Sequence, residues 1–531
     1  PGRIFISPNF ISFRSSGILF QKKFVIPLAS TVKIERLHFR HTFYFKPIKV
    51  VTHDNEFVFC DFLKRKDVLR LLDKCMSNKQ SVAASSPLVS PDKLHQSQAD
   101  VVPEKHKNLN ITILIIGSRG DVQPFIAFAL GLQKEGHRVR IASHTAHKSF
   151  VESWGINFAP LAGDPKDLMR LMVNNESMLS VSFMKEALSN FVQFIEELLW
   201  SAWLACTDES FKPDVIIQNP PTMAGPHIAE ALNIPLFCSF TMPWSRTSSF
   251  PHPFAIPSVP CGPAYNYSSY IAVEEAMFFP IREKFNTFRQ KLKLKELDFG
   301  SGHSIMHDRQ VPFLYCWSPS VLKKPSDWPD FIHVTGYWFL DAPLNWSPSP
   351  ELVKFINQEP KPVYIGFGSI TVDDPDELTT SIINALRETG LRAVLVKGWG
   401  GLADIAYPDN IFALDSVPHD WLFPQMSAVI HHGGAGTTAA GLRAGVPTLI
   451  VPFFGDQFFW GQRVADLGVG VPFLTVKQLK HSLAQALVKL TTDKEIQAKA
   501  RALGEQIRSQ DGVTKAVEVF HTELNRHEQR K

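Results

Sequence analysis

Two histidines and three glycines stand together in the stretch VIHHGGAGTT, residues 429–438. A short apolar run leads into them, and a helical pattern of small and apolar residues follows from Thr437. A glycine-rich turn between a strand and a helix exposes backbone N–H groups, and the helix dipole adds partial positive charge there. The pattern therefore predicts a site for an anionic group, although GGAG alone is equally typical of a tight turn in any α/β protein.

Two further loops follow apolar strands, GSRGD at residues 117–121 and GFGSI at residues 366–370. Ligands of open α/β sheets bind beyond the carboxyl ends of the strands, so these loops and residues 431–438 are the candidates for a shared site. No strand leads into Gly-x-Gly-x-x-Gly with an acidic residue about 20 positions later, and no Gly-Lys-Ser/Thr occurs. The sequence thus argues against a dinucleotide fingerprint and a P-loop.

The segments that must position these loops alternate between strands and helices from residue 109 onward. We expect strands at residues 110–116, 137–143, 214–218 and 235–240, a loop at 117–124 and a helix at 125–136. A second strand–helix series begins at residue 361 and ends in polar helices over 477–525. The fold class is therefore α/β, with two Rossmann-like domains facing a cleft, residues 109–345 and 361–525.

A small basic module is predicted at residues 1–75. Alternating strand patterns fill residues 2–60, and a helical pattern follows at 64–75. The module holds fourteen Lys and Arg against six Asp and Glu, while the whole chain has a net charge of only +4. This imbalance favours attachment to an acidic surface, although a scaffold module with a solvated basic face is the alternative. Residues 76–108 are rich in Ser, Gln, Lys and Pro and are expected to be a disordered linker.

The composition of the 531 residues, 44% hydrophobic and 20% charged, is that of a globular protein. No apolar stretch approaches the roughly 20 residues needed to span a bilayer. The first residue is Pro1, so we expect the chain to be a fragment in which any upstream targeting signal would not be seen. Its six cysteines include no Cys-x-x-Cys pair, which suits reduced thiols in the cytosol, and its 19 histidines form no metal-binding array.

The chain resembles the sterol 3-beta-glucosyltransferases of fungi and plants, within the nucleotide-sugar glycosyltransferases of the GT-B fold. The resemblance runs from residue 110 to about 523 and rests on ITILIIGSRGDVQPFIAFALGLQKEGHRVRIASH, FAPLAGDP, TMPWSR, VPFLYCWSPSVL, HVTGYWFLD, PVYIGFGSI and residues 429–464. Residues 1–75 resemble a GRAM domain, a pleckstrin-homology-like lipid-binding module, through GRIFISPNFISFRS, KKFVIPLASTVKIE and FVFCDFLKRKDVLRLL. Together the two parts resemble the fungal form.

This resemblance implies inverting transfer of glucose from UDP-glucose to a sterol 3-hydroxyl, without a metal or other cofactor and without any role for nucleic acid. It also implies a cytoplasmic protein held peripherally at an anionic or phosphoinositide-containing membrane through residues 1–75. The residues that the resemblance places around UDP-glucose are Ser118, Arg119, Asp121, Ser416, Val417, His419, His432, Ala435, Gly436, Thr437, Asp456 and Gln457. Within this set, Ser416–His419 match the segment that lines uracil and ribose, His432–Thr437 surround the diphosphate, and Asp456 and Gln457 contact the sugar hydroxyls.

Asp121 is the residue that the resemblance makes the general base. Many relatives that glucosylate small molecules have a His three residues before the loop proline, whereas this chain has Asp121 three before Pro124. A carboxylate at hydrogen-bond distance takes the hydroxyl proton as the new C–O bond forms. Because a plain Asp is a weak base near pH 7, burial should raise its pKa or a His should assist. The alternative is an Asp that caps the following helix, and both roles are compatible.

Other functions stay open at this point. The same fold serves transferases that act on other lipids or on polyketide-like aglycones. A lipid-binding adaptor with a decayed transferase domain is a further alternative, disfavoured because Asp121, His432 and the Asp456–Gln457 pair are all present. The aromatic, Pro-rich stretch 240–257 could line a sterol groove, touch a bilayer or simply pack as a loop.

Overall fold

The computed structural model divides the chain into two compact units, Pro1–Val102 and Pro103–Lys531. It describes six strands within residues 2–59 and, in the second unit, residues 108–164, 192–257, 259–298, 302–340, 346–368, 370, 374–398, 402 and 405–529. The helix expected at 64–75 and the linker expected at 76–108, apart from Asn108, lie outside these residues.

The strands of the first unit form two antiparallel three-stranded sheets. One sheet has the order β1 (Gly2–Ile6), β2 (Phe10–Ser15), β3 (Lys23–Pro27), and the other has the order β4 (Thr31–Arg36), β5 (Ile48–Thr52), β6 (Glu56–Phe59). Their alternation of apolar and polar residues is the pattern of strands with one covered face.

The second unit holds two parallel sheets, as expected for two Rossmann-like domains. The larger has seven strands in the order β13 (Ile332–Val334), β12 (Phe313–Tyr315), β11 (Leu236–Phe240), β10 (Val215–Gln218), β7 (Asn110–Leu114), β8 (Arg138–His144), β9 (Asn157–Leu161). The smaller has five, in the order β16 (Ile411–Leu414), β15 (Ala393–Val396), β14 (Val363–Gly366), β17 (Val429–His431), β18 (Thr448–Ile450).

Helices follow the strands of both sheets. The first sheet carries α2 (Arg119–Lys134), α3 (Lys148–Glu152), α6 (Val192–Thr207), α7 (Gly225–Leu232), α8 (Gly262–Phe278), α9 (Arg282–Lys291) and α10 (Ile305–Asp308). With the second sheet come α11 (Pro350–Ile356), α12 (Pro375–Thr389), α13 (His419–Leu422), α14 (Ala435–Ala444), α15 (Gln457–Asp466), α16 (Val476–Thr492) and α17 (Lys494–Arg508).

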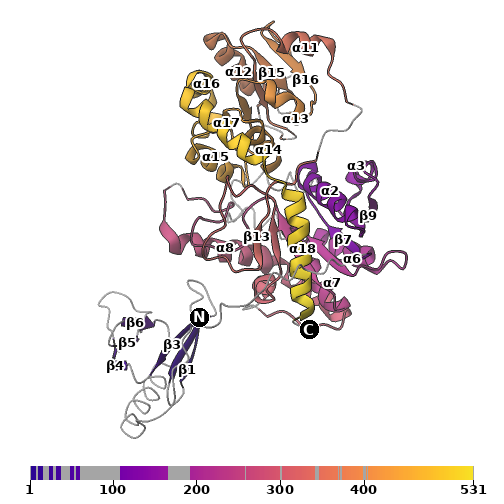
Figure 1. Ribbon diagram of the computed structural model, residues 1–531, viewed down its shortest axis with the longest axis vertical. Coiled ribbons are helices and arrows are strands. Elements are labelled where there is room, and N and C mark those ends of the chain that lie inside the picture. The colour runs from indigo at the N-terminus through magenta and orange to yellow at the C-terminus, as the bar shows by residue number, and fades with distance from the viewer. Residues whose placement is uncertain are drawn as a thin grey trace. The chain divides into compact units, whose positions relative to one another are not determined.

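The last helix, α18 (Gly512–Gln529), returns to the first sheet although it follows the second one in the chain. Figure 1 shows this yellow helix beside α2 and β7, in indigo to purple. Its apolar residues Ala516, Val517 and Phe520 belong to the same buried cluster as Ile113 and Phe125. The C-terminal segment thereby ties the two domains together.

The expected loop at residues 117–124 is wrong in part, because α2 already begins at Arg119. Ser118 and Asp121 form a capping box at its start, with each side chain paired to the other residue's backbone. Pro124 lies inside the helix and lacks an N–H donor for the carbonyl four residues earlier. Pro124 suggested a loop, but the cap at Ser118, directly after Gly117, starts the helix.

Candidate functional site

The loop after β7 folds its acidic side chain back onto its own backbone. Oδ2 of Asp121 accepts hydrogen bonds from the Ser118 backbone N–H at 2.8 Å and from the Ser118 hydroxyl at 2.9 Å. Gly117 has φ +134°, and a Cβ placed on it would stand 2.5 Å from Oδ2 of Asp121. Only glycine permits this turn and this approach. Both of these hydrogen bonds use Oδ2, so Oδ1 is the oxygen that remains for a ligand.

The electrostatic surroundings of Asp121 make its carboxylate a stronger base than a solvated one. Burial raises the pKa of Asp121, while the Ser118 hydrogen bonds and the charge of a protonated His147 act in the opposite direction. The net shift is upward. His147 ends the 3-10 turn Thr145–His147 after β8, and its Nε2 lies 3.0 Å from the Gly117 carbonyl oxygen.

His147 is a residue that the sequence analysis missed. Its signal was available, because it closely follows the carboxyl end of β8, the strand that pairs with β7. Ligand-binding residues of α/β sheets gather at such strand ends. Arg119, by contrast, points elsewhere: its guanidinium carbon lies 4.2 Å from the centre of the Phe150 ring.

The glycine-rich turn of the second domain joins β17 to α14 as predicted. Gly434 occupies the N-cap of α14 and gives no side-chain hydrogen bond to the first turn, which contains Ala435, Gly436 and Thr437. The backbone donors of that turn are therefore uncapped by any side chain. Gly436 is exposed, and a Cβ on it would have no neighbour within 4 Å. This end of α14 has the form of an anion site.

His432 supplies a second polar group to the same turn. Its Nδ1 is buried and has no hydrogen-bond partner in the part of the chain that the structure describes. Burial, together with the charge that a protonated His419 would carry, lowers the pKa of His432 to about 4. The imidazole is therefore neutral at pH 7 and has an unpaired ring nitrogen that a ligand could satisfy.

Ser416, Val417 and His419 lie between the end of β16 and the first residue of α13. The Tyr364 hydroxyl lies 3.2 Å from Nε2 of His419, and the His419 ring stacks on Phe423 with centres 4.4 Å apart. Burial lowers the pKa of His419 to about 4. Val417 is half-buried and Ser416 is exposed. The His419, Tyr364 and Phe423 rings thus form an aromatic surface at this strand end.

Asp456 and Gln457 lie at the start of α15, and their side chains have different hydrogen-bond partners. Oδ2 of Asp456 accepts a hydrogen bond from Nε1 of Trp460 at 2.9 Å. Oε1 of Gln457 accepts from the backbone N–H of Phe453 at 2.7 Å and of Phe454 at 3.2 Å. Gln457 therefore holds its own loop through its oxygen and keeps its amide N–H groups for other partners.

Asp456 and Asp121 interact electrostatically although they come from different domains. Burial raises the pKa of Asp456 to about 7, the Trp460 hydrogen bond acts against this, and the Asp121 charge adds to it. Two buried carboxylates repel each other, so ionising both at once is unfavourable. The charge of Asp121 thus acts on Asp456 from the other domain, and a Cβ on Gly433, in the turn that contains His432, would stand 3.3 Å from Cβ of Gln457.

An apolar pocket opens in the first domain near the same sheet edge. Its volume is about 80 Å³, well below the roughly 300–1,000 Å³ of small-molecule sites. It is lined by Gln218, Pro220, Met223, Pro226, His227, Trp244, Glu274, Met277, Phe278, Ile281, Phe285, Gly302, Ile305 and Met306. Gln218 ends β10, the strand beside β7. Trp244 shows that the stretch 240–257 both packs internally and lines this pocket.

The described residues contain neither a membrane-spanning helix nor a metal-binding cluster. None of their helices combines the length and the apolar content required to cross a bilayer. Within the same residues, no group of three or more His, Cys, Asp or Glu side chains is arranged to hold a metal ion.

Solved structures define the class of the fold. The glycosyltransferase of kitacinnamycin superposes with a TM-score of 0.60 at 17% identity, covering 78% of this chain and 99% of that one. The calicheamicin glycosyltransferase CalG4 gives 0.57 at 18% identity over 79% and 98%. VinC, solved in complex with dTDP, gives 0.54 at 20% identity over 79% and 100%. The second unit has the GT-B glycosyltransferase fold, and the predicted fold class is confirmed.

In sequence, the chain is similar to sterol 3-beta-glucosyltransferases. The chain is 40% identical to the one from Cryptococcus neoformans var. neoformans serotype D, over 98% of this chain and 36% of that protein. It is 39% identical to the Aspergillus terreus protein over 98% and 41%, and 47% identical to the Aspergillus oryzae protein over 79% and 30%. The predicted resemblance is confirmed, and the chain spans about two fifths or less of these relatives' lengths.

Three family descriptions match successive parts of the chain. The GRAM domain matches residues 1–81, the glycosyltransferase family 28 N-terminal domain matches 111–251, and the erythromycin biosynthesis protein CIII-like C-terminal domain matches 400–521. The expected GRAM module is therefore confirmed at the N-terminal end.

Proposed function

We propose that this protein transfers glucose from UDP-glucose to the 3-hydroxyl of a membrane sterol, with inversion at the anomeric carbon. The observation that carries the proposal is the uncapped end of α14 with the unpaired Nδ1 of His432 beside it, and the effect of the Asp121 charge on Asp456 from the other domain supports it. The similarity to sterol 3-beta-glucosyltransferases supports the choice of donor and acceptor.

The proposed reaction begins at Asp121. Its free Oδ1 takes the proton of the sterol 3-hydroxyl while the hydroxyl oxygen bonds to the anomeric carbon. The bond from that carbon to the UDP oxygen breaks in the same displacement, and the electron pair leaves on the diphosphate. The raised pKa of Asp121 suits this duty, and His147 beside Gly117 would stabilise the loop.

The second domain would hold the donor. The backbone N–H groups of Ala435, Gly436 and Thr437 and the ring of His432 would face the diphosphate, whose negative charge increases as the bond breaks. Asp456 and the amide of Gln457 would contact the glucose hydroxyls, so that an epimer leaves a buried group unpaired. Ser416, Val417 and His419 would line the uracil and ribose. Arg119 would reach the site only by leaving the Phe150 ring.

The mainly apolar lining of the pocket between α7, α8 and α9 is proposed to contact part of the sterol, since a volume of about 80 Å³ is too small to enclose the whole molecule. Residues 1–75 are proposed to bring the enzyme to an anionic membrane, since they carry an excess of basic residues and match the GRAM domain.

The test is UDP-glucose turnover by the purified chain with ergosterol, cholesterol and a sphingoid base offered in parallel. We expect release of UDP with both sterols and little with the sphingoid base. Turnover with the sphingoid base alone would move the proposal to another lipid acceptor.

A further inference from the structure

His431, the first of the two adjacent histidines at the end of β17, contacts the backbone of the glycine-rich turn that follows it. The side chain is completely buried. Its Nδ1 lies 3.0 Å from the backbone nitrogen of Gly433, whose N–H donates to it. A hydrogen bond from a backbone N–H to the side chain two residues earlier closes a small turn, and here His432 is the residue between the two.

The same contact determines the tautomer of the His431 ring. A backbone N–H can only donate, so Nδ1 accepts and the proton of the neutral ring is on Nε2. Burial, followed by the charges that protonated His432 and His419 would carry, lowers the pKa of His431 well below its ordinary value of 6.5. The ring is therefore neutral at pH 7 and keeps Nδ1 as an acceptor for Gly433.

The His431 ring is enclosed between β17 and α14. Its Nε2 is buried and has no hydrogen-bond partner among the residues that the structure describes. A Cβ placed on Gly441 of α14 would stand 3.9 Å from this nitrogen and 3.1 Å from Cγ2 of Val429. The helix thus packs closely on the end of the strand, and close packing holds the ring in one orientation.

Gly433 depends on the acceptor that His431 provides. It is buried and has φ +91°. A Cβ on it would stand 2.6 Å from Cγ2 of Ile450 and 3.2 Å from the Gln457 carbonyl oxygen, so neighbouring atoms crowd this glycine. A buried backbone N–H needs a hydrogen-bond partner, and Nδ1 of His431 fills that need.

We propose that His431 positions the diphosphate-binding turn: by accepting the Gly433 N–H, it fixes the backbone around His432 so that the His432 ring and the first turn of α14 face the same anion. The proposal rests on the proposed function, which puts the diphosphate there. His431 acts through its neighbours and is a positioning residue. Without its acceptor, the Gly433 N–H would be left unpaired unless the turn moved.

The experiment compares the affinities of the full chain for UDP and for uridine, which lacks the diphosphate. Calorimetric titration gives the UDP affinity, and displacement of UDP gives that of uridine. His431→Phe keeps a ring of similar size but has no acceptor. It should weaken UDP binding about tenfold and leave uridine binding within about twofold, so the UDP-to-uridine affinity ratio falls.

His431→Asn separates positioning from general stability. The Asn side-chain oxygen can accept from the N–H two residues on, so the ratio should stay within about threefold of the parent value. Asn is smaller than Phe and leaves a larger cavity, so this variant should have the lower Tm of the two. A purely structural role would make UDP affinity follow Tm, whereas positioning predicts the opposite order.

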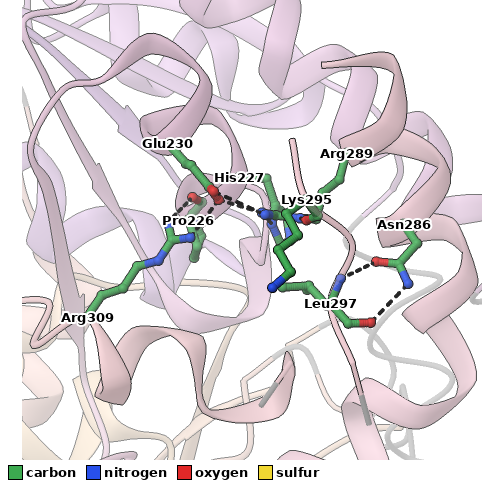
Figure 2. A network of polar contacts seen from close by, with 8 residues as sticks. All are labelled: Pro226, His227, Glu230, Asn286, Arg289, Lys295, Leu297 and Arg309. Atoms are coloured by element: carbon green, nitrogen blue, oxygen red, sulfur yellow. Dashed lines mark hydrogen bonds and ion pairs between the residues drawn. The ribbon is translucent and has the colours of Figure 1, made fainter. Parts of the chain in front are cut away.

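Asn286 in α9 offers a matched control in the first domain (Figure 2). Its Oδ1 accepts from the Leu297 backbone N–H at 2.8 Å, and its Nδ2 donates to the Leu297 carbonyl oxygen at 3.1 Å. Asn286→Leu also deprives a buried backbone N–H of its side-chain acceptor. It should lower the Tm and leave the UDP-to-uridine ratio unchanged.

An unchanged ratio in folded His431→Phe would overturn the inference and leave the proposed donor site intact. Equal losses of UDP affinity in His431→Phe and His431→Asn would overturn it as well. If His431→Phe does not fold, His431→Gln replaces it, because its amide lies one carbon further out, at the reach of Nε2 rather than Nδ1. A parent protein that binds UDP no better than uridine would overturn the proposed diphosphate site, and this inference with it.

Discussion

At the scale of single residues, the two carboxylate oxygens of Asp121 have different roles, one in capping α2 and one in the proposed proton transfer. Oδ2 accepts both hydrogen bonds from Ser118 and starts α2, while Oδ1 is left for a ligand. The helix-capping role and the proposed general-base role are therefore compatible, and the cap fixes the direction in which the base points. An oriented carboxylate of raised pKa is what proton removal from a hydroxyl needs near neutral pH.

Replacing Asp121 with Asn should lower turnover by a factor of about 10² or more, as expected for loss of a general base. Asn keeps an oxygen that can accept the Ser118 hydrogen bonds, so the fold and UDP affinity should change little. Steady-state kinetics and calorimetric titration with UDP give the two quantities. Near-normal turnover in a folded variant would refute the role of Asp121.

The raised pKa of Asp456 predicts that the free energy of unfolding depends on pH. Its folded pKa of about 7 exceeds the ordinary value of 3.8, so between these pH values the folded protein keeps a proton that the unfolded chain releases. The contribution of this group to the free energy of unfolding therefore falls as pH rises through that window. Asp456→Asn, which can still accept from Trp460, should raise the Tm by a few °C at pH 8 and by little at pH 4.

The comparison needs a second carboxylate on the same helix as a control. Asp466 lies in α15 with its side chain 48% exposed, and Asp466→Asn should give no pH-dependent gain in Tm. An equal effect of both variants, or no effect of Asp456→Asn at pH 8, would show that Asp456 is not held in a protonated state.

At the scale of elements, the first turn of α14 contains a residue, Gly436, at which a substitution should affect folding and ligand binding in opposite directions. Gly436 lies in the first turn of this helix, where alanine is a better helix former by about 1 kcal/mol at most. A Cβ there meets no protein atom within 4 Å, so it would project into the space proposed for the diphosphate.

Gly436→Ala should therefore unfold at the same or a higher temperature than the parent and yet bind UDP at least tenfold more weakly. Thermal unfolding and UDP titration on the same sample measure both effects. Unchanged UDP affinity would mean that the phosphates do not approach this turn.

The elements also show what sequence reasoning could reach. Strands such as β7 and β10 were predicted to within about two residues, because buried parallel strands are short apolar runs bounded by polar loops. The start of α2 was missed because Pro124 outweighed the capping box. The return of α18 to the first sheet depends on which apolar face finds a partner in space, and periodicity alone cannot identify that partner.

The candidate site was predictable to a similar degree. Residues in glycine-rich loops, such as His432 and Gly436, stand out by type and position. His147 does not, since it lies after a strand in an ordinary polar sequence. Its importance comes from its contact with the Gly117 carbonyl oxygen.

At the scale of the whole molecule, residues 1–75 should deliver the enzyme to its substrate rather than perform chemistry. A sterol lies in the bilayer, so holding the transferase at the surface raises the effective acceptor concentration. Each basic residue near an anionic surface adds about 1 kcal/mol, and salt screens this attraction. Because the chain divides into two compact units, the first can be removed without cutting the second.

A chain that begins at Leu109 should keep its turnover on detergent-solubilised sterol and lose most of it on anionic liposomes. Liposome activity of the longer chain should also fall as salt rises. Co-sedimentation is the direct readout, and equal binding of both chains to anionic liposomes would leave the module a scaffold.

The most direct measurement is the structure of the product formed by the full chain from UDP-glucose and ergosterol, determined by mass spectrometry and NMR of the purified lipid. The account predicts one hexose on the 3-oxygen with a β-anomeric linkage, formed with one equivalent of UDP. An α-linkage would contradict direct displacement assisted by Asp121. Hydrolysis of UDP-glucose with no sterol product under any acceptor condition would contradict the central claim that the two domains join a sterol hydroxyl to glucose.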